Sequence, residues 1–524
     1  MWRKWWFWVL SVVVLIIVGL AIAAPILARR FEPFVREETA RYLRERFDAE
    51  VEIGSLDASL AFKSVTNVLL ARGKGALVRA KGENITLRHK GRRDVPPLLQ
   101  MSKFEFELDV STLWNHPVDI HKVKLEGFTL NIPPKGERPS IPKGEEDKTP
   151  EDNATVHIRE IVADDTLLTI LPKTSDKKPL VFTLHELHLF GAGPGRAMRY
   201  EAELTNAKPP GKIISKGTFG PWATSEPSST PLTGDYTFDK ADLWVFKGIA
   251  GTLSSKGRFE GLLNRVVVDG TTSTPDFRLT MSGNKVPLTT KFHAIVDGTN
   301  GDTLLEPVEA QLGRTSFECR GGVVRNQDEI GKTVALDVKL RQGTIEDLLR
   351  LAMKGNKPIL RGGIELKMQF ELPPGKGEIS DRLKVKGTFA LRDAQFTSTT
   401  VQEQIDNLSR RGQGRPKDQA IDEVPSDLDG SFTMHRGRID FSRLRFTVPG
   451  SEVRLAGAYL FDKEELDFHG ELRLEARVSE TMTGWKRLVL KPVDRFFAKE
   501  GAGTLLKIAV TGPRSSPKFG RDRK

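Results

Sequence analysis

Alternation of apolar and charged residues with a period of two constrains the fold of this chain more than any other feature. In residues 104–110 (FEFELDV) every second residue is apolar, and the residues between them are Glu or Asp. Successive side chains of a β-strand point to opposite faces of the sheet, so the pattern predicts a strand with one buried and one wet face. Equivalent stretches are residues 334–340, 364–372, 383–391, 453–461, 466–474 and 506–510. Because strands of parallel sheets read instead as unbroken apolar runs, the chain is expected to be mainly β with antiparallel sheet.

An unbroken apolar run from Trp5 to Ala28 predicts a membrane-spanning helix. Ser11 is its only polar side chain, and the run exceeds the ~20 apolar residues that a bilayer-spanning helix requires. A cleavable signal peptide is the alternative, but the apolar core of such a signal is shorter, about 7 to 15 residues. Arg3 and Lys4 precede the run and two arginines follow it, so the positive-inside rule leaves its orientation open.

Helices are expected to be few and short, too few to cover the apolar face of so much sheet. The predicted helices are residues 34–47, amphipathic and next to the membrane; 344–354, with Thr344 and Asp347 as a box-like cap and Gly355 as the stop; 401–411, capped by Thr400 and Glu403; and 479–500.

Composition and charge give an ordinary globular mixture with a basic excess. The chain has 80 Lys and Arg against 69 Asp and Glu, a net charge of +11. This excess suits an anionic membrane surface as well as nucleic acid, but the basic residues are scattered among acidic ones, which favours a solvated face and no nucleic-acid partner. The single cysteine, Cys319, excludes an intrachain disulfide. We expect it to be a small buried apolar residue.

Glycine recurs two residues before an aromatic residue. Chance alone gives roughly 3 such pairs for this composition, so the count is only suggestive. Residues two apart share a face of a strand, so each glycine is expected beside an aromatic ring on the apolar side, where a sheet can bend or a ring can cover bare backbone. The six pairs are Gly217/Phe219, Gly234/Tyr236, Gly257/Phe259, Gly387/Phe389, Gly430/Phe432 and Gly457/Tyr459.

Motifs of known catalytic chemistry are absent from the sequence, which has no phosphate-binding P-loop, no Gly-x-Ser-x-Gly and no His-Glu-x-x-His. His185 and His188 are three apart in a strand-like stretch, so their rings are expected on opposite faces and not as joint metal ligands. His116 and His121, with Asp119 nearby, form only a loose pattern. No catalytic site, metal or cofactor is predicted.

Long stretches of the sequence resemble the AsmA-like family. Residues from Leu383 (LKVKGTFALRDAQFTSTTVQEQIDNLSRRGQG), then DGSFTMHRGRIDFSRLRFTVPGSEVRLAGAYLFDKEELDFHGEL and IAVTGPRSSPKF, are similar to the C-terminal region of that family. The anchor followed by YLRERFDAEVEIGSLDASL and VDIHKVKLEGFTLNIPP is similar to its start, and the block from LTNAKPPGKIISKGTFGPW to PDFRLTMSG is similar to its middle. The resemblance implies a bacterial inner-membrane protein with its bulk in the periplasm, built as an elongated, curled, taco-like β-groove. Such proteins are thought to carry phospholipid toward the outer membrane or to support outer-membrane assembly.

The expected organisation combines this resemblance with two polar segments that have little to bury, residues 133–153 and, less clearly, 412–425. It is a transmembrane anchor (1–30), an N-terminal AsmA-like β region (31–132), a flexible linker (133–153), a central β-groove region (154–380), an AsmA-like C-terminal region (381–519) and a basic tail (520–524).

Two sets of residues are candidates for lipid contact. Groove candidates are the apolar members of alternating strands: Phe104, Phe106, Leu108, Leu366, Met368, Phe370, Val385, Phe389, Leu455 and Phe468. Bilayer-interface candidates lie on one stripe of the amphipathic stretch 485–499, with Lys and Arg beside them: Trp485, Leu488, Phe496 and Phe497. The expected partners are the inner-membrane bilayer, phospholipid and outer-membrane components.

Other interpretations fit the same alternation. The apolar face could close on itself as a sandwich core, and the stretch 485–499 could be a helix that closes the sheet. A non-catalytic scaffold or regulator of outer-membrane protein assembly would need only exposed edges and a partner surface.

Overall fold

The described part of the chain is mainly β and forms two compact units. The computed structural model describes residues 44, 49–62, 76–109, 118–133, 156–171, 179–193, 195–223, 226–325, 331–355, 357–375, 377–418, 422–460, 462–477, 480–481, 503–513 and 516–522. Residues up to 240 together with 258–264 make one unit, and 241–257 together with 265 onwards make the other. Within the described ranges, twenty-three strands belong to one large sheet, and a second sheet has two strands.

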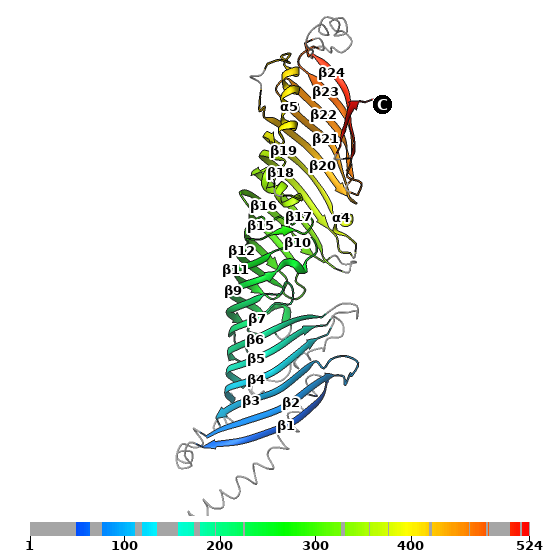
Figure 1. The fold of residues 1–524 in the computed structure, drawn as a ribbon. Helices are drawn as coiled ribbons and strands as arrows, with labels where there is room; N and C mark the ends of the chain where they lie inside the picture. Colours follow the sequence, from blue (N-terminus) through cyan, green and yellow to red (C-terminus); the bar gives the residue numbers. More distant parts are fainter. Residues whose placement is uncertain are drawn as a thin grey trace, which may run out of the picture. The chain divides into compact units, whose positions relative to one another are not determined.

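In the first unit, strands pair in chain order, as the labels in Figure 1 show. The strands are β1 (Ala49–Phe62), β2 (Ala76–His89), β3 (Leu99–Asp109), β4 (Val118–Ile132), β5 (Val156–Ile170), β6 (Leu180–Ala192), β7 (Met198–Thr205), β8 (Lys212–Phe219) and β9 (Pro231–Asp242). All their described pairings are antiparallel except β4–β5.

The β4–β5 pair is parallel and departs from the expected antiparallel order. Val118 opposes Val156, and Ile132 opposes Ile170. A hairpin cannot join parallel neighbours, because the chain must return along the length of the strand before the next one begins. The polar segment predicted as a linker, residues 133–153, falls in this connection and lies outside the described residues except for Pro133.

The second unit continues the same neighbour-to-neighbour order in antiparallel pairs. Its large-sheet strands are β12 (Arg265–Thr274), β14 (Leu288–Val296), β15 (Thr303–Leu312), β16 (Thr315–Val324), β17 (Thr333–Thr344), β18 (Leu360–Leu372), β19 (Lys384–Phe396), β20 (Ser426–His435), β21 (Arg438–Val448), β22 (Ser451–Leu460), β23 (Glu465–Leu474), β24 (Thr504–Pro513) and β25 (Lys518–Arg521). Strand β11 (Thr252–Leu262) has residues in both units, and the small sheet pairs β10 (Ile249–Ala250) with β13 (Arg278–Leu279).

Tight turns account for this order. The β20–β21 hairpin pairs His435 with Arg438, and its two turn residues, Arg436 and Gly437, have φ of 50° and 68°. Positive φ at both turn residues matches the twist of the flanking strands, which is why this turn joins neighbours. Wherever the chain is described, the predicted strands coincide with β3, β17, β18, β19, β22, β23 and β24. The ends of β22 and β23 agree within two residues, whereas β3, β17, β18, β19 and β24 extend three to five residues further at one end than predicted.

Helix α3 (Ile345–Ala352) confirms the predicted helix but not its capping box. Thr344 is the N-cap, yet its side chain makes no capping hydrogen bond to the helix backbone. Instead Thr344 Oγ1 donates to Asp347 Oδ2 (2.9 Å), which also accepts from the Arg314 backbone N–H (2.8 Å). Asp347 therefore ties the helix to the turn between β15 and β16.

Helix α5 (Thr399–Gly412) begins two residues earlier than predicted, with Ser398 instead of Thr400 at the N-cap. In the segment 412–425, less clearly expected as a linker, residues 412–418 and 422–425 are described. Buried Asp406 accepts hydrogen bonds from the backbone N–H groups of Val424 (2.9 Å) and Glu423 (3.2 Å), which fixes the chain after the helix. Backbone hydrogen bonds, and not a large apolar surface, hold this segment.

The main core of the second unit lies where α3 packs on the apolar face of the sheet. Buried Leu340, Ile345, Leu360, Ile364, Leu391 and Ala394 form it. Helix α5 contacts β19, β21 and β22, and a short helix α4 (Ile379–Arg382) contacts β20 (Figure 1). Helices α3 and α5 lie at one end of the strands, before β18 and β20, and α4 lies at the other end, between β18 and β19. A smaller cluster around Ile53 and Ile85 lies in the first unit.

Candidate functional site

The candidate site is an apolar row that crosses the second unit from strand to strand. Cross-strand register links its members one to the next, and each is apolar or glycine. We call it the central row: Gly270, Phe292, Val308, Cys319, Val338, Met368, Gly387, Phe432, Phe441, Gly457, Phe468 and Val510. Twelve strands at ~4.8 Å spacing give the row a length of about 50 Å.

Two flanking rows lie two residues to either side on the same face. The first flanking row is Val268, Ala294, Leu305, Gly321, Leu336, Phe370, Val385, Met434, Ile439, Tyr459, Leu466 and Gly512, and the second is Leu340, Leu366, Phe389, Gly430, Leu444, Leu455, Gly470 and Ile508. All seven groove candidates in this unit fall in these three rows. They are Leu366, Met368, Phe370, Val385, Phe389, Leu455 and Phe468.

Burial along the rows is partial. In the central row Val308, Cys319 and Phe468 are buried, at 8%, 8% and 7% exposed, while Phe292, Val338, Met368, Phe432, Phe441 and Val510 are only half-buried. Among the described residues, the second sheet consists of β10 and β13 alone, so no large second sheet is present to make a sandwich core over this face. Burial raises the pKa of the Cys319 thiol, and the expectation of a buried apolar cysteine is confirmed.

Glycines in the rows are covered by rings from the neighbouring strand. A Cβ on Gly430 would lie 2.9 Å from Phe389 Cε1, and one on Gly387 would lie 3.0 Å from Phe432 Cζ. Gly82 and Gly270 are covered in the same way by Phe104 and Phe292. Of the six predicted glycine–aromatic pairs, Gly234, Gly387 and Gly430 lie beside a ring, but the ring comes from a neighbouring strand and not from two residues along the chain. At Gly217 and Gly457 the nearest atoms are backbone atoms of the neighbouring strand.

Aromatic rings in the central row contact one another in sequence. Phe432 lies 6.2 Å from Phe389 and 6.3 Å from Phe441, and Phe441 lies 5.6 Å from Phe468, measured between ring centroids. These tilted contacts, at 4.5–7 Å, are the favoured arrangement for aromatic pairs. The row is therefore a continuous apolar surface over these strands.

The first unit has a row of the same kind. Its members are Ala58, Ala80, Phe106, Val123, Ile161, Leu189, Tyr200, Gly217 and Gly234. Phe104 stacks on Phe106 with 6.0 Å between ring centroids, and Leu108 pairs with Val78 and Ile120. The three groove candidates of this unit thus alternate along one strand, β3.

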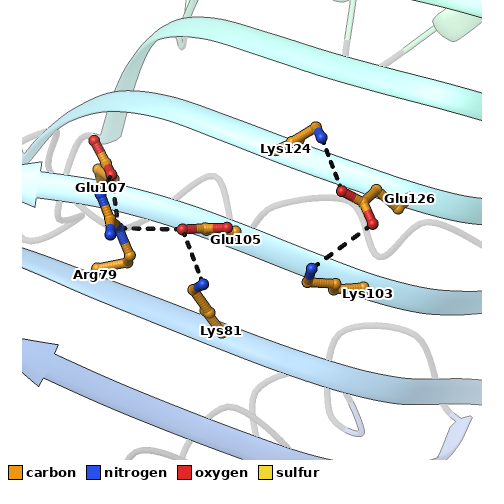
Figure 2. Close-up of polar contacts among 7 residues, drawn as sticks. All are labelled: Arg79, Lys81, Lys103, Glu105, Glu107, Lys124 and Glu126. Carbon is orange, nitrogen blue, oxygen red and sulfur yellow. Dashed lines mark hydrogen bonds and ion pairs between the residues drawn. The ribbon is translucent and has the colours of Figure 1, made fainter.

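The opposite face of the first unit carries cross-strand ion pairs (Figure 2). Arg79 contacts Glu105 (3.1 Å) and Glu107, and Glu126 lies between Lys124 (2.8 Å) and Lys103 (3.8 Å). The hydrogen bond from Lys124 and the charge of Lys103 lower the pKa of Glu126. Exposed pairs of this kind contribute little to stability, so they matter more for register and solubility.

Two hollows, of about 350 and 940 Å³, lie over β15–β21 of the second unit. Most of their lining residues alternate with the members of the three rows and so belong to the polar face. The lining of the smaller hollow includes Lys339, Lys367 and Lys386. Sequence reasoning missed this cluster, because the three lysines come together only through the register of β17, β18 and β19.

The described histidines of these patterns do not assemble a metal site, and His116 lies outside the described residues. His185 Nε2 contacts Thr205 Oγ1 (2.8 Å), whereas His188 contacts Glu186 (2.9 Å) and Glu160 (3.3 Å). Asp119 accepts hydrogen bonds from Arg159, which lower the pKa of Asp119. No group of three or more His, Cys, Asp and Glu in the described part of the chain could hold a metal ion.

Several predicted features lie outside the described residues. They are the apolar run from Trp5 to Ala28, the amphipathic helix 34–47 except Arg44, the helix 479–500 except 480–481, and Trp485, Leu488, Phe496 and Phe497. Within the described ranges, no helix has the length and apolar character needed to cross a bilayer.

Comparisons with known proteins do not identify a family for this chain. No family model, no curated protein and no solved structure matches this chain. The fold and site define a class in physical terms: a many-stranded single-layer sheet with continuous apolar rows on one face and charged residues on the other.

Proposed function

We propose that this protein is a membrane-anchored periplasmic lipid-binding protein, whose sheet curls around its apolar face and carries phospholipid between inner and outer membrane, supporting outer-membrane integrity. The observation that carries the proposal is the set of three unbroken apolar rows. About 50 Å of row and about 14 Å across three rows give a surface on the order of 700 Å². Apolar patches larger than a few hundred Å² are rare on soluble monomers and indicate an interaction site.

The dimensions and energetics suit acyl chains. A leaflet's chains span about 15 Å, half of the ~30 Å hydrocarbon core, so a row of this length exceeds one lipid. Moving about 30 methylenes into water costs ~0.8 kcal/mol each, near 25 kcal/mol, which makes unassisted transfer a matter of days. Acyl chains that lie on an apolar face such as that around Leu366 and Met368 avoid part of this free-energy cost, while the headgroups stay in water.

Site-specific photo-crosslinking tests the proposal on one strand. Leu455 belongs to the second flanking row, and its neighbour Ala456 is exposed and alternates to the other face of β22. A photoreactive phenylalanine analogue at Leu455 is expected to form phospholipid adducts in intact cells, and the same analogue at Ala456 is not. Equal lipid adducts at both positions contradict the proposal. Adducts of Leu455 with a protein instead of a lipid favour the alternative of a scaffold in outer-membrane protein assembly.

The proposed location has its own test. The run from Trp5 to Ala28 is proposed to anchor the chain in the inner membrane, with residues from Arg29 onward in the periplasm. Alkaline phosphatase fused after Lys524 is expected to be active in intact cells. An inactive fusion together with an active cytoplasmic reporter at the same position contradicts both the location and the transport proposal.

A further inference from the structure

The smaller hollow on the polar face of the second unit holds an unusual arrangement of positive charge. Its volume is about 350 Å³. Nine of its thirteen lining residues belong to the polar face by their alternation along β17–β21: Asp337, Lys339, Lys367, Gln369, Lys386, Thr388, Ser431, Thr433 and Ser442. Three are lysines, four carry hydroxyl groups, and one is acidic.

The three lysines lie close together by register. Lys339 pairs directly with Lys367 across β17 and β18, and Lys367 pairs with Thr388, two residues from Lys386. Directly opposed Cβ atoms are about 4.5–5.5 Å apart and diagonal ones about 7–8 Å. Like charges directly opposite destabilise a sheet, so the pairing of Lys339 with Lys367 works against folding. On its other side Lys339 faces Glu318 of β16, whose carboxylate lies 2.8 Å from the Arg320 side chain.

The lysines of this hollow differ from those of the first unit. There, Lys81, Lys103 and Lys124 each lie within 4 Å of a glutamate on the same or a neighbouring strand (Figure 2). Among the described residues, Lys339, Lys367 and Lys386 form no ion pair, and the acidic Asp337 in the same hollow forms none either. The hollow therefore keeps three exposed ammonium groups available to a ligand.

We propose that this hollow binds a phosphate group. Three ammonium groups around one point suit a tetrahedral oxyanion, which presents several acceptor oxygens at once, and lysine binds phosphate as a point charge. Hydroxyl groups supply further donors: Thr388 opposes Ser431, and Ser431 Oγ lies 2.7 Å from Ser442 Oγ. A bound phosphate offsets the repulsion between Lys339 and Lys367, so binding stabilises the strands that form the site. This inference concerns the wet face and is independent of the proposed lipid path.

Titration of the full-length protein with inorganic phosphate and pyrophosphate tests the inference by calorimetry. Replacing Lys339, Lys367 and Lys386 by Gln is expected to weaken binding by roughly tenfold or more, because each charge-assisted hydrogen bond lost costs about a factor of ten. The matched control replaces Lys81, Lys103 and Lys124 by Gln, which removes the same charge from the polar face of the first unit. It is expected to bind like the unmodified protein.

Vesicles distinguish the two sources of the phosphate. Binding to phosphatidylglycerol vesicles beyond that to phosphatidylcholine vesicles, lost with the first triple variant, identifies a lipid headgroup; binding of the soluble anions alone identifies a free phosphate. The inference is overturned if the unmodified protein does not bind phosphate, or if both triple variants lose phosphate binding equally. Binding of an acidic peptide in place of phosphate overturns it as well.

The single variant Lys367→Glu gives a second readout. A glutamate at this position opposes Lys339 on one side and Thr388 on the other, so it replaces repulsion with an opposite-charge pair. The thermal midpoint of the phosphate-free protein is therefore expected to rise while phosphate binding is lost. A variant that binds phosphate normally overturns the inference, whatever its stability.

Discussion

Phe389 covers Gly430 across the β19–β20 pair, and the relationship is reciprocated by Phe432 over Gly387. The register places Phe389 opposite Gly430 and Gly387 opposite Phe432. Two Gly-x-Phe sequences running in opposite directions thus bring each ring over the other's glycine. Each ring covers backbone that has no side chain of its own, which helps to hold the register of the two strands.

Gly430→Ala is expected to destabilise the protein by about 1–3 kcal/mol, since overpacking at a well-packed position costs this much. The added Cβ would lie 2.9 Å from both the Arg443 carbonyl oxygen and Phe389 Cε1, and the backbone oxygen has little freedom to move. Chemical denaturation measures the change. The control is Gly363→Ala on β18, where the nearest atom to a new Cβ is 3.9 Å away. Equal destabilisation by the two variants contradicts the account of the covered glycine.

Met368→Glu is expected to leave the protein folded and to remove most of its co-purifying phospholipid. Met368 is half-buried in the central row between Val338 and Gly387. On an uncovered face the carboxylate reaches water, whereas in a packed core an unpaired charge costs several kcal/mol. Expression level, protease resistance and bound lipid are the measurements, with Ala456→Glu on the opposite face as the control. A variant that fails to fold argues for a closed core, and one that keeps its lipid argues against a lipid path along this row.

Asp406→Ala is expected to release the segment after α5, at a cost of about 1–3 kcal/mol for each buried donor left unpaired. Its carboxylate accepts from the backbone N–H groups of Glu423 and Val424 and from Gln402 Nε2 (3.0 Å). Hydrogen exchange of the amides of residues 422–424 measures the release. Exchange that is unchanged in the variant shows that other contacts hold this segment.

The pH dependence of the same contact follows from the pKa of Asp406. Burial by itself raises this pKa, but the hydrogen bonds from Val424 and Gln402 outweigh burial and lower it. A lowered pKa means that the stabilisation is present above the ordinary value near 4 and is lost as the pH falls through the folded-state pKa. Protection of residues 422–424 is therefore expected to be constant at neutral pH and to fall only in acid.

His469 is expected to give β25 the opposite pH dependence. Its ring contacts Asp522 (3.0 Å) and Asp467 (3.1 Å), and these hydrogen bonds raise the pKa of His469. A raised pKa means that the stabilisation is complete below the ordinary value near 6.5 and is lost as the pH rises through the folded-state pKa. Hydrogen exchange of β25, corrected for the intrinsic rate, is expected to quicken over that range. Asp522→Asn should reduce this dependence, and an unchanged pH profile in that variant contradicts the assignment.

The strands were predictable because alternation is a local signal. In residues 364–372 each apolar side chain is followed by a polar one, and β18 covers that stretch with the same faces. The helix at Thr344 was predictable too, but the partner of Asp347 was not: its hydrogen bonds go to Arg314 and Thr315, about thirty residues earlier in the chain. Side chains of this kind satisfy whichever donors the tertiary fold brings near, and sequence spacing does not contain that information.

Register explains why the lysine hollow was missed. Lys339, Lys367 and Lys386 each look like ordinary polar members of an alternating strand, and only the pairing of three strands puts them at one level. A shift of one residue in that pairing would turn every side chain to the other face. The parallel β4–β5 pair was missed for a similar reason, since residues 118–132 and 156–170 carry no local mark of their relative direction.

Because strands pair in chain order, the number of strands in this sheet can change by insertion or deletion of hairpins. Within each unit a strand contacts the strand before it and the strand after it, so stability is close to a sum of neighbour terms. Inserting or deleting one antiparallel hairpin preserves the direction and register of all other strands, and it changes the length of the apolar row by about 10 Å, two strand spacings of ~4.8 Å. Gain or loss of hairpins during evolution would therefore lengthen or shorten the apolar row without changing any existing strand pair.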